Sequence, residues 1–423
     1  MNYSVEIQQT ESLLTPYRVL DLADKRGYLC SQILADLGAD VIKIEPPGGD
    51  PGRRIGPFYH DIPDPEKSLF WFAYNTNKRG ITLNIEPADG REILKRLVKT
   101  ADFVIESFPP GYMDRLGLGY SLLSQINPRI IMTSITPFGQ EGPYKDYKAA
   151  DIVLMAMSGL MYLTGDPDRP PVRVSFPQAY LHASAEAAVG TMIAHYHREL
   201  TGEGQWVDAS AQESVIEPTG LALWHWDMHR ENLGRLGPWR GGLSMGGKQR
   251  LLWECKDGHM SYSIYGGHTG APANRALIKW MDEEGMAPDF LKEKDWENFD
   301  ITKASQAELD QISEPIGKFF LEHTKEEIYE EAIKRRLFID PVATISDLLE
   351  NPQLSARAFW QEVEHPELGT AITYPGAFVR LSEASCRIRH RAPLIGEHNE
   401  EIYEKELGLS KEELVVLKQG GVI

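Results

Sequence analysis

The sequence predicts an α/β protein whose N-terminal part is an open, doubly wound parallel sheet. Short, almost continuously apolar segments alternate with helical stretches over the first 140 residues. Strands of this kind are typical of a parallel sheet that helices cover on both faces. The loops that follow them are rich in glycine, proline and cations, as expected at the carboxyl edge of such a sheet. The five predicted strands are 18–22, 40–45, 80–85, 102–106 and 129–134.

Helices are predicted between these strands and beyond them. Residues 27–37 and 87–100 have helical spacing, and Pro87 suits the first turn of the second helix. A longer helix is predicted over 180–199, which lacks proline and carries apolar residues at helical spacing. Two extended segments flank it, a double-proline strand at 170–174 and a strand at 206–210.

The rest of the chain predicts a smaller mixed domain and a final segment. A glycine-rich stretch, 234–247, breaks the composition and is typical of a mobile loop or hinge. We therefore expect a middle domain, 225–337, inserted between an N-terminal part, 1–224, and a C-terminal part, 338–423. The predicted elements are a helix at 214–231, a hairpin at 250–264, helices at 273–284, 306–322, 325–335, 345–349 and 355–361, strands at 371–374 and 377–381, and a last helix capped by Ser410.

Composition and charge exclude several classes of protein. The chain has 423 residues, 42% hydrophobic and 25% charged, which is typical of a soluble globular protein. A net charge of −18 argues against nucleic acid or an anionic membrane surface as a partner. No signal peptide and no membrane-spanning window is visible, so we expect a cytoplasmic protein. Three distant cysteines without CxxC spacing indicate buried thiols in a reducing compartment.

Cations in the loops after the strands indicate an anionic ligand. No GxGxxG motif follows the first strand, where Lys25-Arg26-Gly27-Tyr28 stands, so a dinucleotide is not supported. Loops 46–54 and 109–115 combine glycine and proline with arginine, and loop 75–79 carries Lys78 and Arg79; these cations suit phosphate groups. The alternative is that these loops are solvated turns.

Two histidines one helical turn apart are the only candidate for a metal site. His225 and His229 lie in the helix predicted after residue 214. A stable site needs further ligands, and none is in sight, so we expect packing or surface roles and no metal.

Seven strings, in a fixed order along the chain, carry a resemblance to a known family. They are LADLGADVIKIEP at 34–46, NKRGITL at 77–83, PGYMDRLG at 110–117, NPRI at 127–130, GQEGP at 139–143, TGEGQ at 201–205 and APLIGE at 392–397. With these strings the chain resembles the class III CoA-transferases, the family of formyl-CoA and carnitine CoA-transferases.

The resemblance implies a fold, an assembly and a ligand. It implies a Rossmann-type large domain built from both chain ends, a smaller inserted α+β domain, and an interlocked dimer. Coenzyme A, as acyl-CoA, is the implied substrate, without a metal. Lys78 and Arg115 match the pocket for its adenine and phosphate end, and Pro46, Arg79 and Phe108 complete the expected CoA-binding set.

The same resemblance directs attention to Tyr180. The family uses an Asp carboxylate at a helix N-terminus to attack an acyl-CoA thioester, forming a mixed anhydride and then an aspartyl thioester. This Asp stands ten residues before a helix glycine, and counting back from Gly190 reaches Tyr180. A phenol with a pKa near 10 is neutral and weakly nucleophilic at neutral pH, so it does not replace the carboxylate.

In the first of three interpretations, this chain is the nucleophile-free subunit of a hetero-oligomeric CoA-transferase. A homologous subunit then supplies the Asp. The resemblance implies transfer of CoA from succinyl-CoA to an aromatic dicarboxylic acid such as (R)-benzylsuccinate, a reaction of anaerobic toluene degradation. The non-enzyme version of this interpretation is a CoA-binding regulatory subunit.

The other two interpretations give the chain its own chemistry. A displaced carboxylate is one: Asp166 and Asp168 precede the long helix and Glu186 lies within it, although a solvated bend and a paired polar residue explain them equally. The other follows relatives that racemise α-methylacyl-CoA with a pair of bases. His182 and Asp208 are available for it, although a surface histidine and a structural carboxylate are the simpler explanation.

Overall fold

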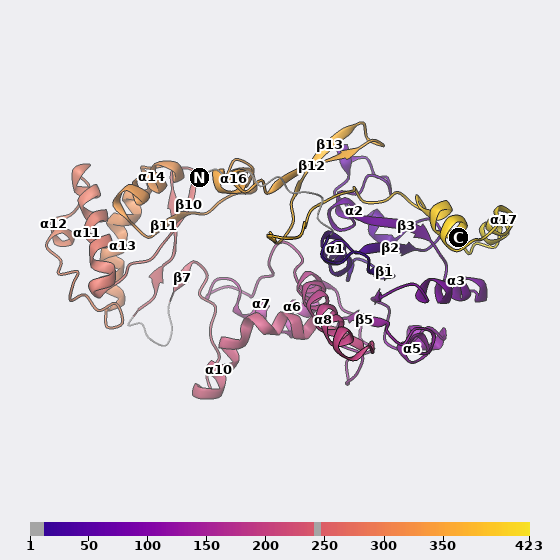
Figure 1. Cartoon of the computed structure of the whole chain (residues 1–423). Coiled ribbons are helices and arrows are strands. Elements are labelled where there is room, and N and C mark those ends of the chain that lie inside the picture. The colour runs from indigo at the N-terminus through magenta and orange to yellow at the C-terminus, as the bar shows by residue number, and fades with distance from the viewer. Residues whose placement is uncertain (1–11, 241–246) are drawn as a thin grey trace. The chain divides into compact units, whose positions relative to one another are not determined.

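The computed structural model describes residues 12–240 and 247–423, and contacts divide the chain into two compact units (Figure 1). The first unit consists of Met1–Leu160, Val174–Gly220 and Pro352–Ile423, and the second of Met161–Arg173 and Leu221–Asn351. The first unit thus combines both ends of the chain. The domain boundaries predicted after residues 224 and 337 stay a prediction.

A six-stranded parallel sheet forms the centre of the first unit, with the order β3-β2-β1-β4-β5-β6. This confirms the predicted α/β class with a parallel sheet. The strand order reverses between β1 and β4, and open α/β sheets bind ligands beyond the carboxyl ends at such a point. The strands are β1 (Arg18–Asp21), β2 (Asp40–Glu45), β3 (Lys78–Thr82), β4 (Phe103–Glu106), β5 (Ile131–Thr136) and β6 (Trp206–Ser210).

Helices cover both faces of this sheet because its strands are apolar on both sides. On one face, α3 (Ala88–Val98) and α5 (Tyr120–Ile126) share a buried cluster with Leu20, Val104 and Met132. On the other, α1 (Tyr28–Asp36) and α8 (Ala179–Thr201) pack against each other and the sheet. Neighbouring residues Val19 and Leu20 are both fully buried but face opposite layers, as the alternation of a strand requires.

The C-terminal segment covers the open edge of β3. The amides of Asn77 and Gly80 donate to the His390 carbonyl and to Nδ1 of His398, at 3.0 and 3.1 Å. The Thr82 amide donates to Oδ1 of Asn399 at 2.9 Å. A free strand edge invites pairing with another chain, so this cover protects the sheet. It also explains why residues near both ends of the sequence belong to one unit.

Helix α8 is the longest helix of the described chain, with 23 residues, and matches the prediction. It ends at Gly202, whose φ of 84° is the left-handed cap that glycine favours. The extended strand predicted at 170–174 is wrong, because that segment pairs with no sheet. Its two prolines lack the amide hydrogens that a sheet would use. The helix predicted at 214–231 is interrupted at Pro218, giving α9 (Ala211–Ile216), a 3₁₀ turn (Glu217–Thr219) and α10 (Gly220–His229).

The second unit has its own core, centred on Trp253, Met281 and Phe320. The predicted hairpin is present as β9 (Leu252–Cys255) and β10 (Gly258–Tyr262), and β11 (Ile339–Pro341) pairs with β10. The predicted glycine-rich loop, 234–247, includes 241–246, which lie outside the described residues. The helices here are α11 (Gly267–Glu283), α12 (Asp289–Lys292), α13 (Gln306–Leu321), α14 (Lys325–Arg335) and α15 (Ile345–Leu349), and a short ribbon joins β7 (Trp239–Arg240) to β8 (Gln249–Arg250).

The C-terminal segment differs from its prediction at two places. The helix predicted at 355–361 is wrong: α16 (Pro352–Ala356) ends early, and β12 (Trp360–His365) pairs with β13 (Thr370–Pro375). Val363 and His365 are buried while their neighbours are exposed, which is the alternation of a strand. The strand predicted at 377–381 has no sheet partner and is also wrong. The last helix, α17 (Lys411–Gln419), begins at Ser410 with a capping box, as predicted.

The remaining helices of the first unit are short, and α7 passes into the second unit. They are the 3₁₀ helices Pro51–Arg54 and Tyr59–Asp61, the helices α2 (Leu69–Tyr74), α4 (Tyr112–Arg115), α6 (Asp151–Met157) and α7 (Leu160–Leu163), and the π-helix Glu400–Glu406. All three cysteines are free thiols. Within the described residues, no helix has the length and apolar character needed to cross a membrane.

Candidate active site

Tyr180, the residue that the sequence analysis matched to the expected nucleophile position, lies in the first turn of α8. Its hydroxyl donates a hydrogen bond to the Ala149 carbonyl at 2.8 Å. Burial raises the pKa of Tyr180 to about 12, although the nearby Arg26 cation favours the phenolate. The side chain is therefore a neutral phenol whose hydrogen is already engaged, and it has no carboxylate oxygen to accept an acyl group.

A carboxylate does stand at this helix terminus, and it belongs to Asp151. Its Oδ1 accepts the amide hydrogens of Gln178 and Ala179, at 2.7 and 2.8 Å. The positive end of the helix dipole and two free amides favour a negative group there. The sequence analysis missed Asp151, because it reaches the helix from a segment 27 residues away and no local motif signals the contact.

Arg26, in the loop after β1, connects the N-terminus of α8 with the carboxyl ends of the central strands. Its Nε donates to Oδ1 of Asp24 at 2.8 Å. Burial alone would raise the pKa of Asp24, but the hydrogen bond and charge of Arg26 outweigh it and lower the pKa. Arg26 also interacts electrostatically with Tyr180 and with Glu106, the last residue of β4. The site thus lies at the switch point between β1 and β4, where this sheet is suited to bind a ligand.

Three of the five predicted CoA-binding residues lie at the carboxyl edge of the sheet. Pro46 directly follows β2 and is exposed, while Phe108 follows β4 and Arg115 ends α4. Phe108 stacks on Tyr112 with ring centroids 4.6 Å apart, and the Arg115 guanidinium lies 5.7 Å from the Tyr112 ring. An aromatic pair beside an exposed cation is suited to a nucleobase and its phosphates.

The other two, Lys78 and Arg79, begin β3 and therefore lie at the amino edge, apart from this group. Lys78 is 2% exposed, and its Nζ donates to Asp21, Asn75 and the Tyr28 carbonyl, at 3.0, 2.9 and 3.1 Å. Burial alone would raise the pKa of Asp21, but the cations of Lys43 and Lys78 lower it. The Lys78 ammonium is thus committed to the interior of the fold.

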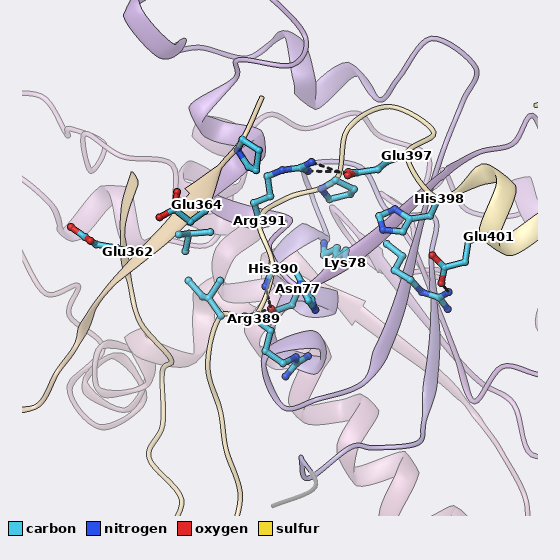
Figure 2. A pocket seen from close by; sticks show the side chains of 15 residues that line it. Asn77, Lys78, Glu362, Glu364, Arg389, His390, Arg391, Glu397, His398 and Glu401 are labelled. Atoms are coloured by element: carbon cyan, nitrogen blue, oxygen red, sulfur yellow. Dashed lines mark hydrogen bonds and ion pairs between the residues drawn. The ribbon is translucent and has the colours of Figure 1, made fainter. Parts of the chain in front are cut away.

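Arg79 is held by carboxylates on three sides. It pairs with Asp40, Glu401 and Glu406 at 2.6 to 2.7 Å. With Lys78 it lines a cavity of about 590 Å³ between β3, β12 and the C-terminal segment. Figure 2 shows Glu362 and Glu364 projecting from β12 at this cavity and Arg391 paired with Glu397. The cations of this cavity are largely neutralised within the chain.

The residues proposed for alternative chemistry are dispersed. Glu186 is exposed on α8, and His182 is half-buried. His182 follows Tyr180 by two residues and therefore lies on a different side of the helix from it, whereas His182 and Glu186, four residues apart, share one face. Asp208, in β6, accepts the Gln140 amide hydrogen at 2.8 Å, and burial raises its pKa. Within the described chain no hydrogen bond or ion pair joins His182 to Asp208. Asp166 and Asp168 belong to the second unit.

The His225–His229 pair has its ring centroids 4.9 Å apart on α10. His225 is buried and its Nδ1 has no hydrogen-bond partner among the described residues. No group of three or more possible ligands is found in the part of the chain that the structure describes. The pair therefore offers two ligands at most.

Comparisons with known proteins identify the family and the fold of the chain. The profile of CoA-transferase family III matches residues 14–399. The chain is 35% identical over 393 residues to subunit BbsE of succinyl-CoA:(R)-benzylsuccinate CoA-transferase from Thauera aromatica, covering 91% of this chain and 92% of that one. It is 33% identical over 428 residues to the formyl-CoA:oxalate CoA-transferase of Streptomyces coelicolor, covering 98% and 100%.

The fold of this chain is also found among solved protein structures. A CAIB/BAIF family protein from Brucella suis superposes with a TM-score of 0.79 at 25% identity, covering 93% of this chain and 99% of that one. The family profile spans most of the 423 residues, and relatives above 30% identity align along almost the whole length. The chain therefore belongs to CoA-transferase family III.

Proposed function

We propose that this chain is the nucleophile-free subunit of a hetero-oligomeric CoA-transferase. A homologous subunit supplies the catalytic Asp, and CoA passes from succinyl-CoA to a carboxylic acid such as (R)-benzylsuccinate. The observation that carries the proposal is the phenol at position 180, hydrogen-bonded to Ala149, where the family's reaction needs a carboxylate. The name of the Thauera aromatica relative, a subunit of such an enzyme, supports the choice of substrates.

The proposed chemistry runs on the partner's carboxylate. That carboxylate attacks the thioester carbonyl of succinyl-CoA and expels the CoA thiolate, leaving a mixed anhydride. The thiolate attacks the anhydride at the enzyme's acyl carbon, releases succinate and forms the aspartyl thioester. The acceptor acid reverses these two steps, so the thioester bond energy is conserved. Tyr180 takes no part, because its phenol group is neutral at neutral pH and its hydroxyl already donates a hydrogen bond to the Ala149 carbonyl.

The geometry supports a binding role for this chain toward CoA. Phe108, Tyr112 and Arg115 form an aromatic and cationic group at the carboxyl edge, next to the switch point of the sheet. We assign the adenine and phosphate end of CoA to this group and to the loop at Pro46. Lys78 and Arg79 contribute indirectly, by fixing β3 through their ion pairs.

Exposed apolar faces support a partner subunit. On α8, four large apolar side chains are 59 to 69% exposed and follow one another at i, i+4, i+7 and i+11: Val189, Ile193, Tyr196 and Leu200. This spacing places them on one face of the helix. Large contiguous apolar surfaces mark interaction sites in soluble proteins. We assign this row, which we call the α8 stripe, to the interface with the homologous subunit.

The test compares the chain alone with the chain co-expressed with a homologue that retains the Asp. CoA exchange between succinyl-CoA and (R)-benzylsuccinate is measured by chromatography of the acyl-CoA products. We expect no exchange by the chain alone and exchange by the pair. As a matched control, Tyr180→Phe in the pair should retain activity within about threefold, because the hydroxyl makes only one hydrogen bond, whose net contribution to stability is small.

Activity of the lone chain would contradict the proposal and select an alternative. Exchange that is lost in Glu186→Gln would identify a displaced carboxylate. Exchange of an α-proton for solvent deuterium, without CoA transfer, would identify an isomerase with His182 and Asp208 as bases. A pair in which this chain binds CoA but is dispensable for transfer would identify a regulatory subunit.

A further inference from the structure

A second cavity, of about 190 Å³, lies against the sheet face that α3 and α5 cover. Its floor consists of side chains from three neighbouring strands, and its walls come from α4 and from the start of α5. Drug-sized ligands occupy cavities of about 300 Å³ or more, so this one is suited to a smaller molecule. None of the residues that we assign to CoA lines it.

The buried charged group of this cavity is the carboxyl group of Glu106, which is 3% exposed. Its Oε2 accepts the Phe108 amide hydrogen at 2.6 Å, and the Ser134 hydroxyl donates to the same carboxyl group. Ser134 in turn accepts the indole hydrogen of Trp206 at 3.0 Å. No ion pair to Glu106 is found among the described residues, and buried carboxylates are ordinarily paired.

The rest of the lining selects against anions and favours a cation. Asp114, which is exposed, adds a second carboxylate and has no ion-pair partner within the described chain, while no lysine, arginine or histidine lines the cavity. Trp206 and Tyr120 supply aromatic surface, and Met113 and Met132 supply thioethers. Aromatic rings and polarisable sulfur attract organic cations, and carboxylates complete the preference.

We propose that this cavity is a binding site for a small organic cation, an alkylammonium whose charged head meets Glu106 and whose alkyl group packs against Met113, Met132 and Trp206. A carboxylate ligand would face two like charges and no counter-charge. A neutral apolar ligand would leave the ionised Glu106 buried without a counter-charge. The Phe108 hydrogen bond gives Glu106 a structural role in the loop after β4, but it accounts neither for the cavity nor for Asp114.

The charge state of Glu106 gives the site a pH dependence. Burial raises the pKa of Glu106 to about 7, against the hydrogen bonds from Ser134 and Phe108 that favour the ionised form. Among the charged groups around it, Arg26 favours ionisation and Asp208 opposes it, while Asp114 adds negative charge from α4. A cation binds the ionised form, so affinity rises with pH through 7 and levels off near pH 8.

The experiment titrates the full-length chain with n-butylammonium and with n-butanol, its neutral counterpart, by calorimetry at pH 6 and pH 8. We expect n-butylammonium to bind at least tenfold more tightly than n-butanol at pH 8, and about tenfold more weakly at pH 6 than at pH 8. The indole N–H resonance of Trp206 should shift on binding, which locates the ligand.

Variants test whether the two carboxylates of the cavity, and not the overall negative charge of the chain, bind the cation. Glu106→Gln keeps the acceptor for Phe108 and should abolish both the preference over n-butanol and the pH dependence. Asp114→Asn, at an exposed position that leaves the core intact, should weaken binding about threefold, and Glu92→Gln, an exposed carboxylate of α3 outside the cavity, should change nothing. Equal binding of n-butanol, a pH-independent affinity of the unaltered chain, or an unchanged affinity in Asp114→Asn and Glu106→Gln would overturn the proposal.

Discussion

Tyr180 and Lys78 are matched to the family's functional positions, yet both direct their polar groups into the protein. Tyr180 donates to the Ala149 carbonyl, and the Lys78 ammonium donates to Asp21, Asn75 and the Tyr28 carbonyl. A ligand would have to break these contacts to reach either group. At the residue scale, the side chains that a ligand can contact are therefore those of the Phe108–Arg115 group and others outside the seven sequence motifs of the family.

Glu106 gives a prediction about stability that is independent of any ligand. Its pKa is raised from an ordinary value near 4.5 to about 7. Between these values the folded state binds the proton more tightly than the unfolded state, so the free energy of unfolding falls as pH rises from about 5 to 7. The whole effect is about 3 kcal/mol, at 1.36 kcal/mol per unit of pKa.

Urea unfolding of the unaltered chain and of Glu106→Gln between pH 5 and 8 measures this effect. We expect the variant to gain stability over the unaltered chain by roughly 1.4 kcal/mol for each pH unit between 5 and 7, then to hold a constant advantage. Glu92→Gln, exposed on α3, should give a difference near zero throughout. A stability difference for Glu106→Gln that does not vary with pH would show that Glu106 is ionised in the fold at pH 5.

At the scale of single elements, α8 serves two surfaces of opposite character. One face buries small residues, among them Ala183, Ala187 and Thr191, and the Thr191 hydroxyl meets that of Thr133 in β5 at 2.7 Å. Small side chains let the helix approach the sheet closely. The α8 stripe, which is exposed, contains larger apolar residues than the buried face does. A helix that needed only its own sheet would carry polar residues there.

Ile193→Asp tests the α8 stripe. A charge in the middle of an apolar interface is strongly unfavourable, so we expect the variant to lose co-purification with the Asp-bearing homologue. The lone chain should keep its stability within about 0.5 kcal/mol of the matched variant Ile333→Asp, since Ile193 is 64% exposed and Ile333 62%. Ile333→Asp makes the same substitution on α14 of the second unit, outside the stripe, and should retain the partner. Pull-down yield and thermal unfolding of both variants measure the two effects.

At the scale of the whole molecule, local patterns predicted the parallel sheet and α8, because continuous apolar strands and helical spacing are properties of neighbouring residues. The wrong predictions arise where residues distant in the sequence determine the local structure. Residues 360–365 form a strand because β13 pairs with them. Residues 170–174 pair with no strand, and their two prolines have no amide hydrogen to donate. The contacts of Asp151 and Glu106 with the site join separate segments and leave no local signal.

The two compact units have separate cores, and a change in the core of one should therefore leave the other folded. Tyr403 is fully buried in the first unit and donates its hydroxyl to the Thr82 carbonyl of β3 at 2.6 Å. Tyr403→Ala removes an aromatic side chain from a packed core, which costs about 3 to 5 kcal/mol. Hydrogen exchange followed by mass spectrometry should then show lower protection in β1 to β5, with protection unchanged in α11, α13 and α14, whose core includes Trp253 and Phe320. Val416→Ala, at a position that is 66% exposed on α17, should leave both units unchanged. Equal loss of protection in both units of Tyr403→Ala would contradict this prediction, because it would mean that the two units unfold as one cooperative body.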